Sequence, residues 1–323
     1  MSKVPDLVVI ASSMVDMICY ADVLPSAGQT ITGTDFVLGF GGKGANQAVM
    51  ARRLGSEVHL TACLGDDVFA HMALDHYGRE GLDLDGVRTV PDVTSGVAPI
   101  WVDSTGENRI VVVPGANAHL SSEQAAEAVE RPAQVDVVLS QMEVPQRATV
   151  AAFAAARRRG ATTILNPAPA LPPVSELLDL TDWIVLNESE FTTLTGTPVG
   201  PVPESDPALV AGAETLRARA VLTLGAAGAA IIDAGEVSRI KAPRMTQVVD
   251  TTGAGDAFVG AFAHLIGAGV PPESACRIAC DCASLSVTRR GTQASFPTPE
   301  EAARLARREG RPARSVTKPP ARG

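Results

Sequence analysis

A glycine-rich turn in the last third of the chain, Asp-Thr-Thr-Gly-Ala-Gly-Asp-Ala-Phe, brings one carboxylate, Asp256, to the expected start of a helix. Gly253, Ala254 and Gly255 let the backbone turn so that consecutive N–H groups point at one anion, and the helix dipole adds to their attraction. The Asp256 carboxylate would repel an anion bound at this turn, so its presence there suggests a chemical role. Taking a proton from a hydroxyl that attacks a phosphate would be such a role. The alternative is an aspartate that only caps a helix after a glycine turn.

A second glycine-rich loop, Gly-Phe-Gly-Gly-Lys-Gly-Ala-Asn-Gln, begins at Gly39. Gly39, Gly41 and Gly44 match the dinucleotide pattern G-x-G-x-x-G, but the loop follows an extended segment rather than a first strand. It also lacks the Ser or Thr that a Walker A loop needs after its lysine. The loop offers backbone N–H groups, a cation at Lys43 and an amide at Asn46, which suit a polyhydroxylated ligand. A helix N-cap beside a solvated lysine is the structural alternative.

Polar residues also follow several apolar runs that read as strands. Asn187 and Glu190 come directly after one such run, and Glu190 could organise Mg²⁺ through water, although the same spacing is that of a capping box. Thr223 ends another run in a glycine-rich turn that could cradle a nucleotide. Glu143 follows a third run. Because ligands bind at the carboxyl ends of strands in α/β sheets, we expect these side chains to share one edge.

The elements that would position these residues alternate between strand and helix, which predicts a parallel sheet covered on both faces. Two β-rich stretches, residues 17–38 and 96–113, break the alternation and could form a small projecting sheet, a candidate lid. The tail from Arg304 is basic and rich in Pro and Gly, and we expect its end to be disordered. Strands are expected at residues 7–10, 135–139, 163–165, 183–186 and 221–224, and helices at 45–54, 150–159 and 208–218.

Composition narrows the function classes. Hydrophobic residues make up 46% and charged residues 20% of the 323-residue chain, as in a globular protein. The 27 basic and 36 acidic residues give a net charge of −9, which argues against a nucleic-acid partner. Apolar runs are too short for a membrane span or a signal peptide. The five cysteines have neither a disulfide-scaffold nor a zinc-site spacing, so a reducing cytoplasm is expected.

In order and combination, these segments resemble the ribokinases of the phosphofructokinase B-type sugar kinase superfamily. The resemblance spans residues 7–297, nearly the whole chain, and implies a three-layer sandwich with a central, mostly parallel sheet and a small β-sheet lid. The lid of many members pairs with that of a second subunit, which implies a homodimer. The matching segments are residues 12–16, 41–46, 166–170, 187–190, 250–256 and 289–293.

The resemblance implies that Asp256 activates the 5-hydroxyl of D-ribose for attack on the γ-phosphate of ATP, with an anion hole at Gly253, Ala254 and Gly255. Sugar contacts would come from Met14, Asp16, Gly42, Lys43, Asn46, Glu143 and Asp256. Nucleotide contacts would come from Asn187, Thr223, Gly225, Gly228, Gly255 and Cys280. Glu190 would act on Mg²⁺ through water. A K⁺ site is implied at Asp250, Thr252, Ser286, Arg289, Gly291 and Ser295, mostly through backbone oxygens.

Met14 stands where several bacterial ribokinases have an asparagine that touches the sugar, which leaves room for another pentose or a deoxypentose. A fructokinase or nucleoside kinase of the same superfamily is the nearest alternative. A dehydrogenase using residues 39–44 for its cofactor would need no base at Asp256. A sugar-binding regulator without catalysis would be expected to have lost the base or the anion-hole glycines, and both are present.

Overall fold

The computed structural model describes residues 3–105, 107–200 and 207–307 of the chain. The strands are β1 (Asp6–Ile10), β2 (Met14–Tyr20), β3 (Asp35–Gly41), β4 (Glu57–Thr61), β5 (Cys63–Gly65), β6 (Arg88–Val90), β7 (Gly96–Val102), β8 (Asn108–Ile110), β9 (Val137–Gln141), β10 (Thr162–Asn166), β11 (Trp183–Asn187), β12 (Arg219–Thr223), β13 (Ala229–Asp233) and β14 (Glu236–Ile240). The helices are α1 (Lys43–Arg53), α2 (Val68–Arg79), α3 (Ser122–Glu130), α4 (Gln146–Arg159), α5 (Ser175–Asp179), α6 (Glu188–Thr195), α7 (Pro207–Glu214), α8 (Ala254–Gly267), α9 (Pro272–Ser286) and α10 (Pro299–Ala306), with 3-10 turns η1 (Gly115–His119) and η2 (Gly225–Ala227).

A central eight-stranded sheet runs in the order β14-β13-β12-β11-β10-β9-β1-β4. The strands from β12 to β4 pair in parallel, and β13 and β14 close one edge antiparallel. Along β1, Leu7 and Val9 belong to the core on one face and Val8 and Ile10 to the core on the other. A strand buried on both faces is expected to be continuously apolar, as this one is.

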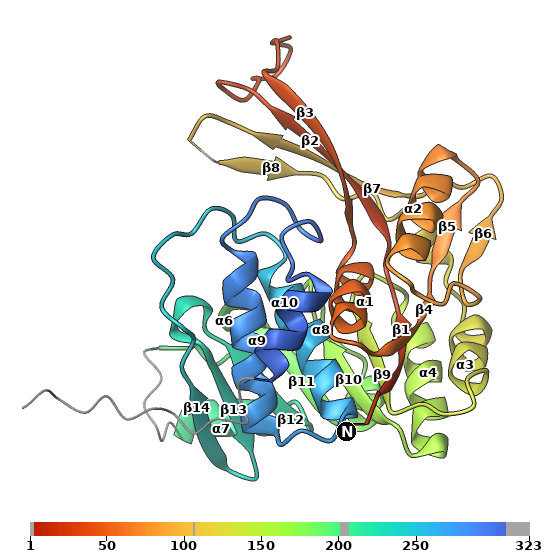
Figure 1. Ribbon diagram of the computed structural model, residues 1–323, viewed down its shortest axis with the longest axis vertical. Helices are drawn as coiled ribbons and strands as arrows, with labels where there is room; N and C mark the ends of the chain where they lie inside the picture. The colour runs from red at the N-terminus through yellow and green to blue at the C-terminus, as the bar shows by residue number, and fades with distance from the viewer. Residues whose placement is uncertain (1–2, 106, 201–206, 308–323) are drawn as a thin grey trace, which may run out of the picture.

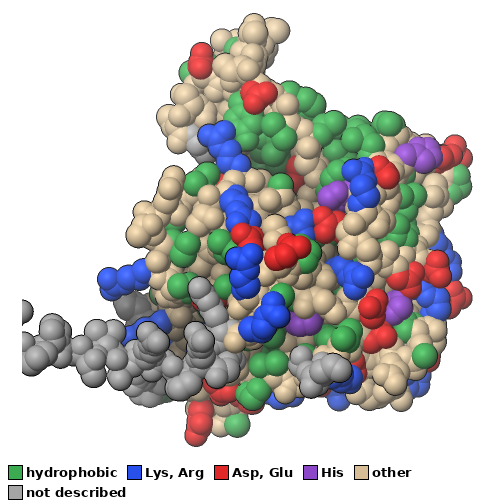
Figure 2. All heavy atoms as spheres, viewed as in Figure 1, with side chains coloured by type: hydrophobic (Ala, Val, Ile, Leu, Met, Phe, Trp, Pro, Cys, Tyr) green, Lys and Arg blue, Asp and Glu red, His purple; other side chains and the backbone are tan. Residues whose placement is uncertain are grey.

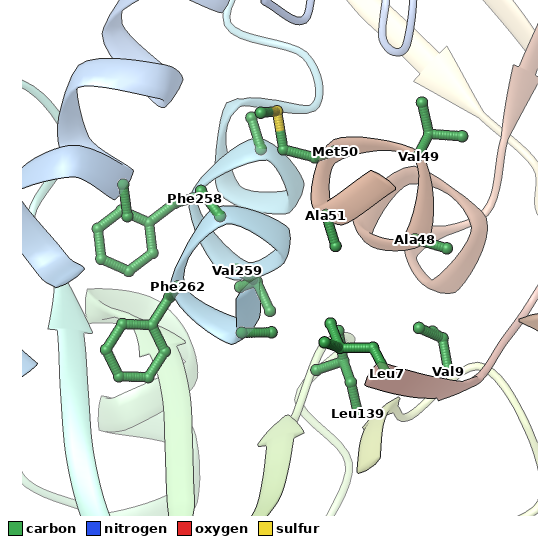
Figure 3. Close-up of a cluster of buried hydrophobic side chains, with 14 of the residues drawn as sticks. Leu7, Val9, Ala48, Val49, Met50, Ala51, Leu139, Phe258, Val259 and Phe262 are labelled. Carbon is green, nitrogen blue, oxygen red and sulfur yellow. The ribbon is translucent and has the colours of Figure 1, made fainter. Parts of the chain in front are cut away.

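Two helical layers cover the sheet, so the expected three-layer sandwich is confirmed (Figure 1). The core on one face takes its helical residues from α1, α2, α8, α9 and α10, and the core on the other face takes them from α3 to α7. Figure 3 shows the first core, where α1 and α8 lie side by side above Leu7, Val9 and Leu139. A side chain on Gly260 would meet the Gln47 carbonyl oxygen at 2.3 Å, so the backbones of α8 and α1 touch.

A four-stranded sheet in the order β3-β2-β7-β8 projects from this body (Figure 1). Strands β2 and β3 extend beyond the expected stretch 17–38 at both of its ends. β2 begins at Met14, only four residues after the end of β1, and β3 continues to Gly41, just before α1. Within the expected stretch 96–113, β7 and β8 pair antiparallel; Gly106, between them, lies outside the described residues. Figure 2 shows hydrophobic side chains where this sheet joins the body. Those exposed on it include Phe36, Val37, Leu38, Trp101 and Ile110.

The C-terminal tail begins later than expected. Arg304 lies in α10, which a capping box at Thr298 and Glu301 starts and whose Ala302 and Leu305 are buried in the core. The apolar stripe of this helix thus outweighs the basic composition on which the expected boundary rested. The expected disorder concerns residues 308–323, which lie outside the described residues.

Candidate active site

The glycine turn before α8 has the geometry that its sequence predicts. Gly253 is the N-cap of α8 with φ 78°, a left-handed conformation that favours glycine. A side chain on Gly253 would also meet Thr292 at 2.6 Å, so the turn packs closely against the segment 289–293. The Ala254 N–H donates to the Thr251 carbonyl at 3.2 Å. Within the described chain, the N–H groups of Gly253 and Gly255 have no such partner and remain for an anion.

Asp256 lies one residue further, in the first turn of α8, and is 8% exposed. Two side-chain amides from α1 hold its carboxylate. Asn46 Nδ2 donates to Oδ2 at 2.8 Å, and Gln47 Nε2 donates to Oδ1 at 2.9 Å. Hydrogen bonds on both oxygens fix the orientation of the carboxylate, and a general base must be held in a fixed geometry. The structure therefore brings Asn46 and Asp256 together, as expected.

A second layer of amides, which the sequence interpretation missed, lies behind Asn46 and Gln47. Gln293 Nε2 donates to Asn46 Oδ1 at 2.8 Å, while Gln47 also donates to Asn166 Oδ1 at 2.9 Å. Gln141 Nε2 in turn donates to Gln47 Oε1 at 2.8 Å. These amides are buried, although glutamine and asparagine are usually exposed. Gln141 and Asn166 end strands β9 and β10, and Gln293 lies two residues after Gly291, so their positions at strand ends and beside a glycine are the signals that could have found them.

Glu143 organises the loop that precedes α1. Its Oε2 atom accepts from the Lys43 N–H at 2.9 Å and from Ser12 Oγ at 2.6 Å. The loop needs glycine at position 42, because Gly42 has φ 86° and a side chain there would meet the Ser12 carbonyl at 2.8 Å. The Asp16 carboxylate lies where a side chain on Gly41 would be, at 2.5 Å, so Asp16 borders the same loop. Met14, at the start of β2, is buried beside it.

The charges of the site influence one another. Burial, with the nearby charges of Glu143 and Asp256, raises the pKa of Asp16 to about 6. The pKa of Lys43 is raised mainly by the charge of Asp256, so this lysine stays cationic beside the base. Burial raises the pKa of Glu190, against the opposing effects of the Asn187 backbone and Lys43. The Lys43 ammonium therefore lies among four carboxylates, those of Asp16, Glu143, Glu190 and Asp256. Such an arrangement suits a phosphate that arrives with a bound cation.

A cavity of about 220 Å³ opens beside Asp256 at the carboxyl ends of β10, β11 and β12. Asn187 and Glu190 form the capping box of α6, with Glu190 Oε2 accepting from the Asn187 N–H at 2.8 Å. The interpretation of Asn187 and Glu190 as a capping box is therefore confirmed. Glu190 also lies on the wall of the cavity. Predicted residues on the wall are Lys43, Asn187, Glu190, Thr223, Gly253, Gly255 and Asp256; Asn166 and Val259 are among the others.

Three expected nucleotide contacts do not line this cavity. Gly225 begins the turn η2 after β12, and Gly228 directly follows that turn. A side chain on Gly228 would collide with the Ile240 carbonyl, so close packing requires glycine at this position. Cys280 is buried in the core, and burial raises the pKa of its thiol to about 12. A larger cavity, of about 410 Å³, lies at the opposite edge of the sheet near Arg157 and Arg219 and contains none of the predicted site residues.

The expected K⁺ loop is held together by Asp250. Its Oδ1 atom accepts from the Thr252 N–H at 2.9 Å and its Oδ2 atom from the Gly291 N–H at 3.0 Å, so the segments before α8 and after α9 lie side by side. The Arg289 guanidinium pairs with Glu301 at 2.6 and 2.9 Å, which leaves only its carbonyl for a cation. Ser286 and Ser295 donate their hydroxyls to the carbonyls of Ala283 and Thr292.

The described residues contain no group of three or more His, Cys, Asp or Glu side chains placed to hold a metal. None of their helices has the length and apolar character needed to cross a bilayer.

Known proteins that are similar to this chain include carbohydrate kinases. The pfkB family carbohydrate kinase profile matches residues 4–299. The deoxyribokinase of Salmonella typhi is 36% identical over 301 residues, covering 92% of this chain and 97% of that protein. The ribokinase of Haemophilus influenzae is 36% identical over 299 residues, covering 91% and 96%. The structure of Arabidopsis thaliana ribokinase complexed with ribose and ATP has a TM-score of 0.86 at 32% identity, covering 95% of this chain and 99% of that one.

The fold and the site thus define a carbohydrate kinase of the α/β sandwich type. The chain belongs to the pfkB family, and the resemblance to ribokinases inferred from its motifs is confirmed. A deoxyribokinase and a ribokinase match it at the same identity, so these comparisons leave the choice of pentose open.

Proposed function

We propose that this protein transfers the γ-phosphoryl group of ATP to the 5-hydroxyl of D-ribose, giving D-ribose 5-phosphate and ADP. The observation that carries the proposal is the buried Asp256 carboxylate, which two amides orient beside the unpartnered N–H groups of Gly253 and Gly255. Arabidopsis thaliana ribokinase, whose fold this chain shares, was solved with ribose and ATP. A proton acceptor next to an anion-binding turn is what phosphoryl transfer to a hydroxyl needs.

In the proposed reaction, the sugar lies on the loop before α1, with hydroxyls on Asp16, Asn46 and the backbone near Gly42. Asp256 takes the proton of the 5-hydroxyl while the oxygen of that hydroxyl forms a bond to the γ-phosphorus. The bond from that phosphorus to the bridging oxygen breaks, and ADP leaves. The N–H groups of Gly253 and Gly255 stabilise the charge that develops on the transferred group, as an oxyanion hole does.

Mg²⁺ and K⁺ are part of the proposal. Mg²⁺ retains waters and takes few carboxylates, so a single Glu190 on the cavity wall fits it better than a protein cage would. When bound, Mg²⁺ would neutralise charge on the nucleotide phosphates. The pairing of Thr252 and Gly291 through Asp250 brings backbone segments together beside the anion hole, which fits the proposed K⁺ loop.

2-Deoxy-D-ribose is the second candidate substrate, because Met14 would favour it over ribose with carbon 2 of the sugar against its side chain. Met14 is buried beside Asp16 and Gly41, where its thioether offers at most a weak acceptor to a sugar hydroxyl. A hydroxyl left without a partner in a buried site costs binding energy, whereas a methylene does not. The effect of Met14 depends on which carbon of the sugar faces it.

An ADP-release assay with D-ribose, 2-deoxy-D-ribose, fructose and nucleosides, with and without K⁺, tests the substrate. We expect ribose to have the highest kcat/KM. A Met14→Asn variant should raise the ribose to deoxyribose ratio of kcat/KM by roughly tenfold, the value of one hydrogen bond to a hydroxyl. A hexose or nucleoside preferred over both pentoses would refute the proposal.

The base is tested separately. Asp256→Asn should lower kcat by at least roughly 10²–10⁴-fold, because an amide cannot take the proton. The fold, followed by circular dichroism, and ATP binding, followed by calorimetry, should be unchanged. Near-normal turnover in this variant would overturn the mechanism.

We also propose that the projecting sheet acts as a lid and pairs with that of a second subunit. Val37 and Ile110 are exposed on one face of it, where the strand register aligns them with Ile18 and Ile100, and exposed apolar surface of this kind commonly marks an interaction site. The molar mass from light scattering should be about twice that of the chain, and Ile110→Lys should reduce it to one chain.

A further inference from the structure

We propose that Gln293 and His76 are positioning residues that set the orientation of Asn46 and, through it, of the base Asp256. The inference rests on the proposed function and extends it to two residues outside the loops that would touch sugar and nucleotide. It is carried by a directional chain of hydrogen bonds that runs from α2 to α8.

The direction of this chain is dictated by Asp256. An ionised carboxylate only accepts, so Asn46 must turn its NH₂ group toward it, as it does at 2.8 Å. Asn46 Oδ1 then faces Gln293, which must present Nε2, as it does at 2.8 Å. Gln293 Oε1 is left facing His76 Nε2 at 2.7 Å, so that nitrogen must carry a proton. Each group thus selects the orientation of the next.

Gln293 and His76 are themselves held firmly. Arg53 Nη1 donates to the Gln293 carbonyl at 2.8 Å, and the same guanidinium forms two hydrogen bonds with Glu80. The His76 ring stacks on Phe40 of β3, with centroids 4.3 Å apart and planes inclined by 8°. Gln293 therefore has a fixed backbone, and His76 a fixed ring plane. Both are preconditions for orienting a neighbouring amide.

The role of the chain follows from the shape of an amide. The oxygen and nitrogen of Asn46 are nearly equal in size, so packing alone does not decide which of them faces Asp256. The Asp256 carboxylate and the hydrogen bond from Gln293 decide it together, because the reversed amide would set oxygen against the carboxylate and nitrogen against the Gln293 donor. In the correct orientation the second Nδ2 hydrogen also remains for a sugar hydroxyl. Loss of Gln293 should therefore weaken both the base and sugar binding, but leave ATP binding alone.

Gln293→Met removes the orienting group and is compared with Gln124→Met. Gln124 is as well buried, at 4% against 3% exposed, but its amide caps backbone carbonyls near α3, away from the site. We expect Gln293→Met to lower kcat roughly tenfold and raise the KM for the sugar several-fold, with the KM for ATP unchanged. Gln124→Met should lower thermal stability and leave the three kinetic constants unchanged.

Two substitutions of His76 separate the hydrogen bond from the stacking. His76→Phe keeps a ring on Phe40 but donates nothing, and we expect kcat to fall roughly fivefold. His76→Gln places an N–H near the position of Nε2 and should restore kcat to within about twofold of the wild type. These two His76 variants test the positioning role even if Gln293→Met does not fold.

The outcomes distinguish this inference from the proposed function. A wild-type protein that phosphorylates no sugar, or an active Asp256→Asn variant, would overturn both. If those two results are as expected, two others would refute the positioning role alone. One is that Gln293→Met changes only stability, as Gln124→Met does. The other is that His76→Phe and His76→Gln behave alike.

Discussion

The stability of this protein should depend on pH through His264, a residue of α8 that is remote from the proposed chemistry. His264 is buried, and its Nδ1 atom lies 2.7 Å from Ser56 Oγ. Burial lowers its pKa from 6.5 to about 4. Above about pH 6.5, the imidazole is neutral in both the folded and the unfolded chain, and it adds no pH dependence.

Between these two values, the unfolded chain binds a proton at His264 and the folded chain does not. The stability present above the unfolded pKa is therefore lost as the pH falls toward the folded pKa of about 4. Relative to neutral pH, the free energy of unfolding should be lower by roughly 2 kcal/mol at about pH 5 and by roughly 3 kcal/mol at about pH 4. This is a large part of the total stability of a typical domain.

His264→Asn removes the titration and keeps a polar partner near Ser56. Urea unfolding of both proteins, followed by circular dichroism at about pH 8 and about pH 5, isolates the effect because the other histidines are common to both. We expect the free energy of unfolding of the wild type to fall by roughly 2 kcal/mol more than that of the variant. Parallel profiles would show that His264 takes up its proton in the folded state, and the reasoning would fail.

Two further predictions concern the site and its frame. Because the pKa of Asp16 is raised to about 6, its charge is lost as the pH falls below that value; the sugar KM should then rise, while that of Asp16→Asn should be high and nearly constant. A KM that follows the same pH curve in both proteins would contradict this. Gly260→Ala should cost roughly 1–3 kcal/mol of stability and lower kcat, because its side chain would lie 2.3 Å from the Gln47 carbonyl. Thermal unfolding and turnover test this, and unchanged values would show that α1 and α8 can separate freely.

The framework of the fold was predictable from the sequence because its signals are local. The run at residues 7–10 is apolar without interruption, as a strand buried on both faces must be. The three arginines and glycine that end α4 mark its end correctly, with Gly160 as a left-handed cap. Element boundaries were less certain, since α1 begins at Lys43 rather than at residue 45 because the glycine loop itself forms its first turn.

The candidate site was predictable where glycine or a carboxylate marked it, as at Gly253 and Asp256. The amide side chains behind them were not predictable, because no periodicity or spacing in a sequence distinguishes a buried glutamine or asparagine from an exposed one. The contact of Gln293 with Asn46 joins residues 247 positions apart, and only the folded chain brings them together. The position of His76 beside Gln293 likewise depends on the packing of α2 against β3, through the stacking of His76 on Phe40.

The contact between α1 and α8 at Gly260 bears on how such a kinase can change its substrate. The proposed base, Asp256, lies on α8 and the amides that hold it lie on α1, and at Gly260 no side chain separates the two backbones. Met14 and Asp16 lie on β2, in the projecting sheet, outside this rigid pair. Substitutions at these two positions can therefore change proposed sugar contacts without displacing the proposed base. Such a division would let one frame serve both of the proposed pentoses, which differ by a single hydroxyl.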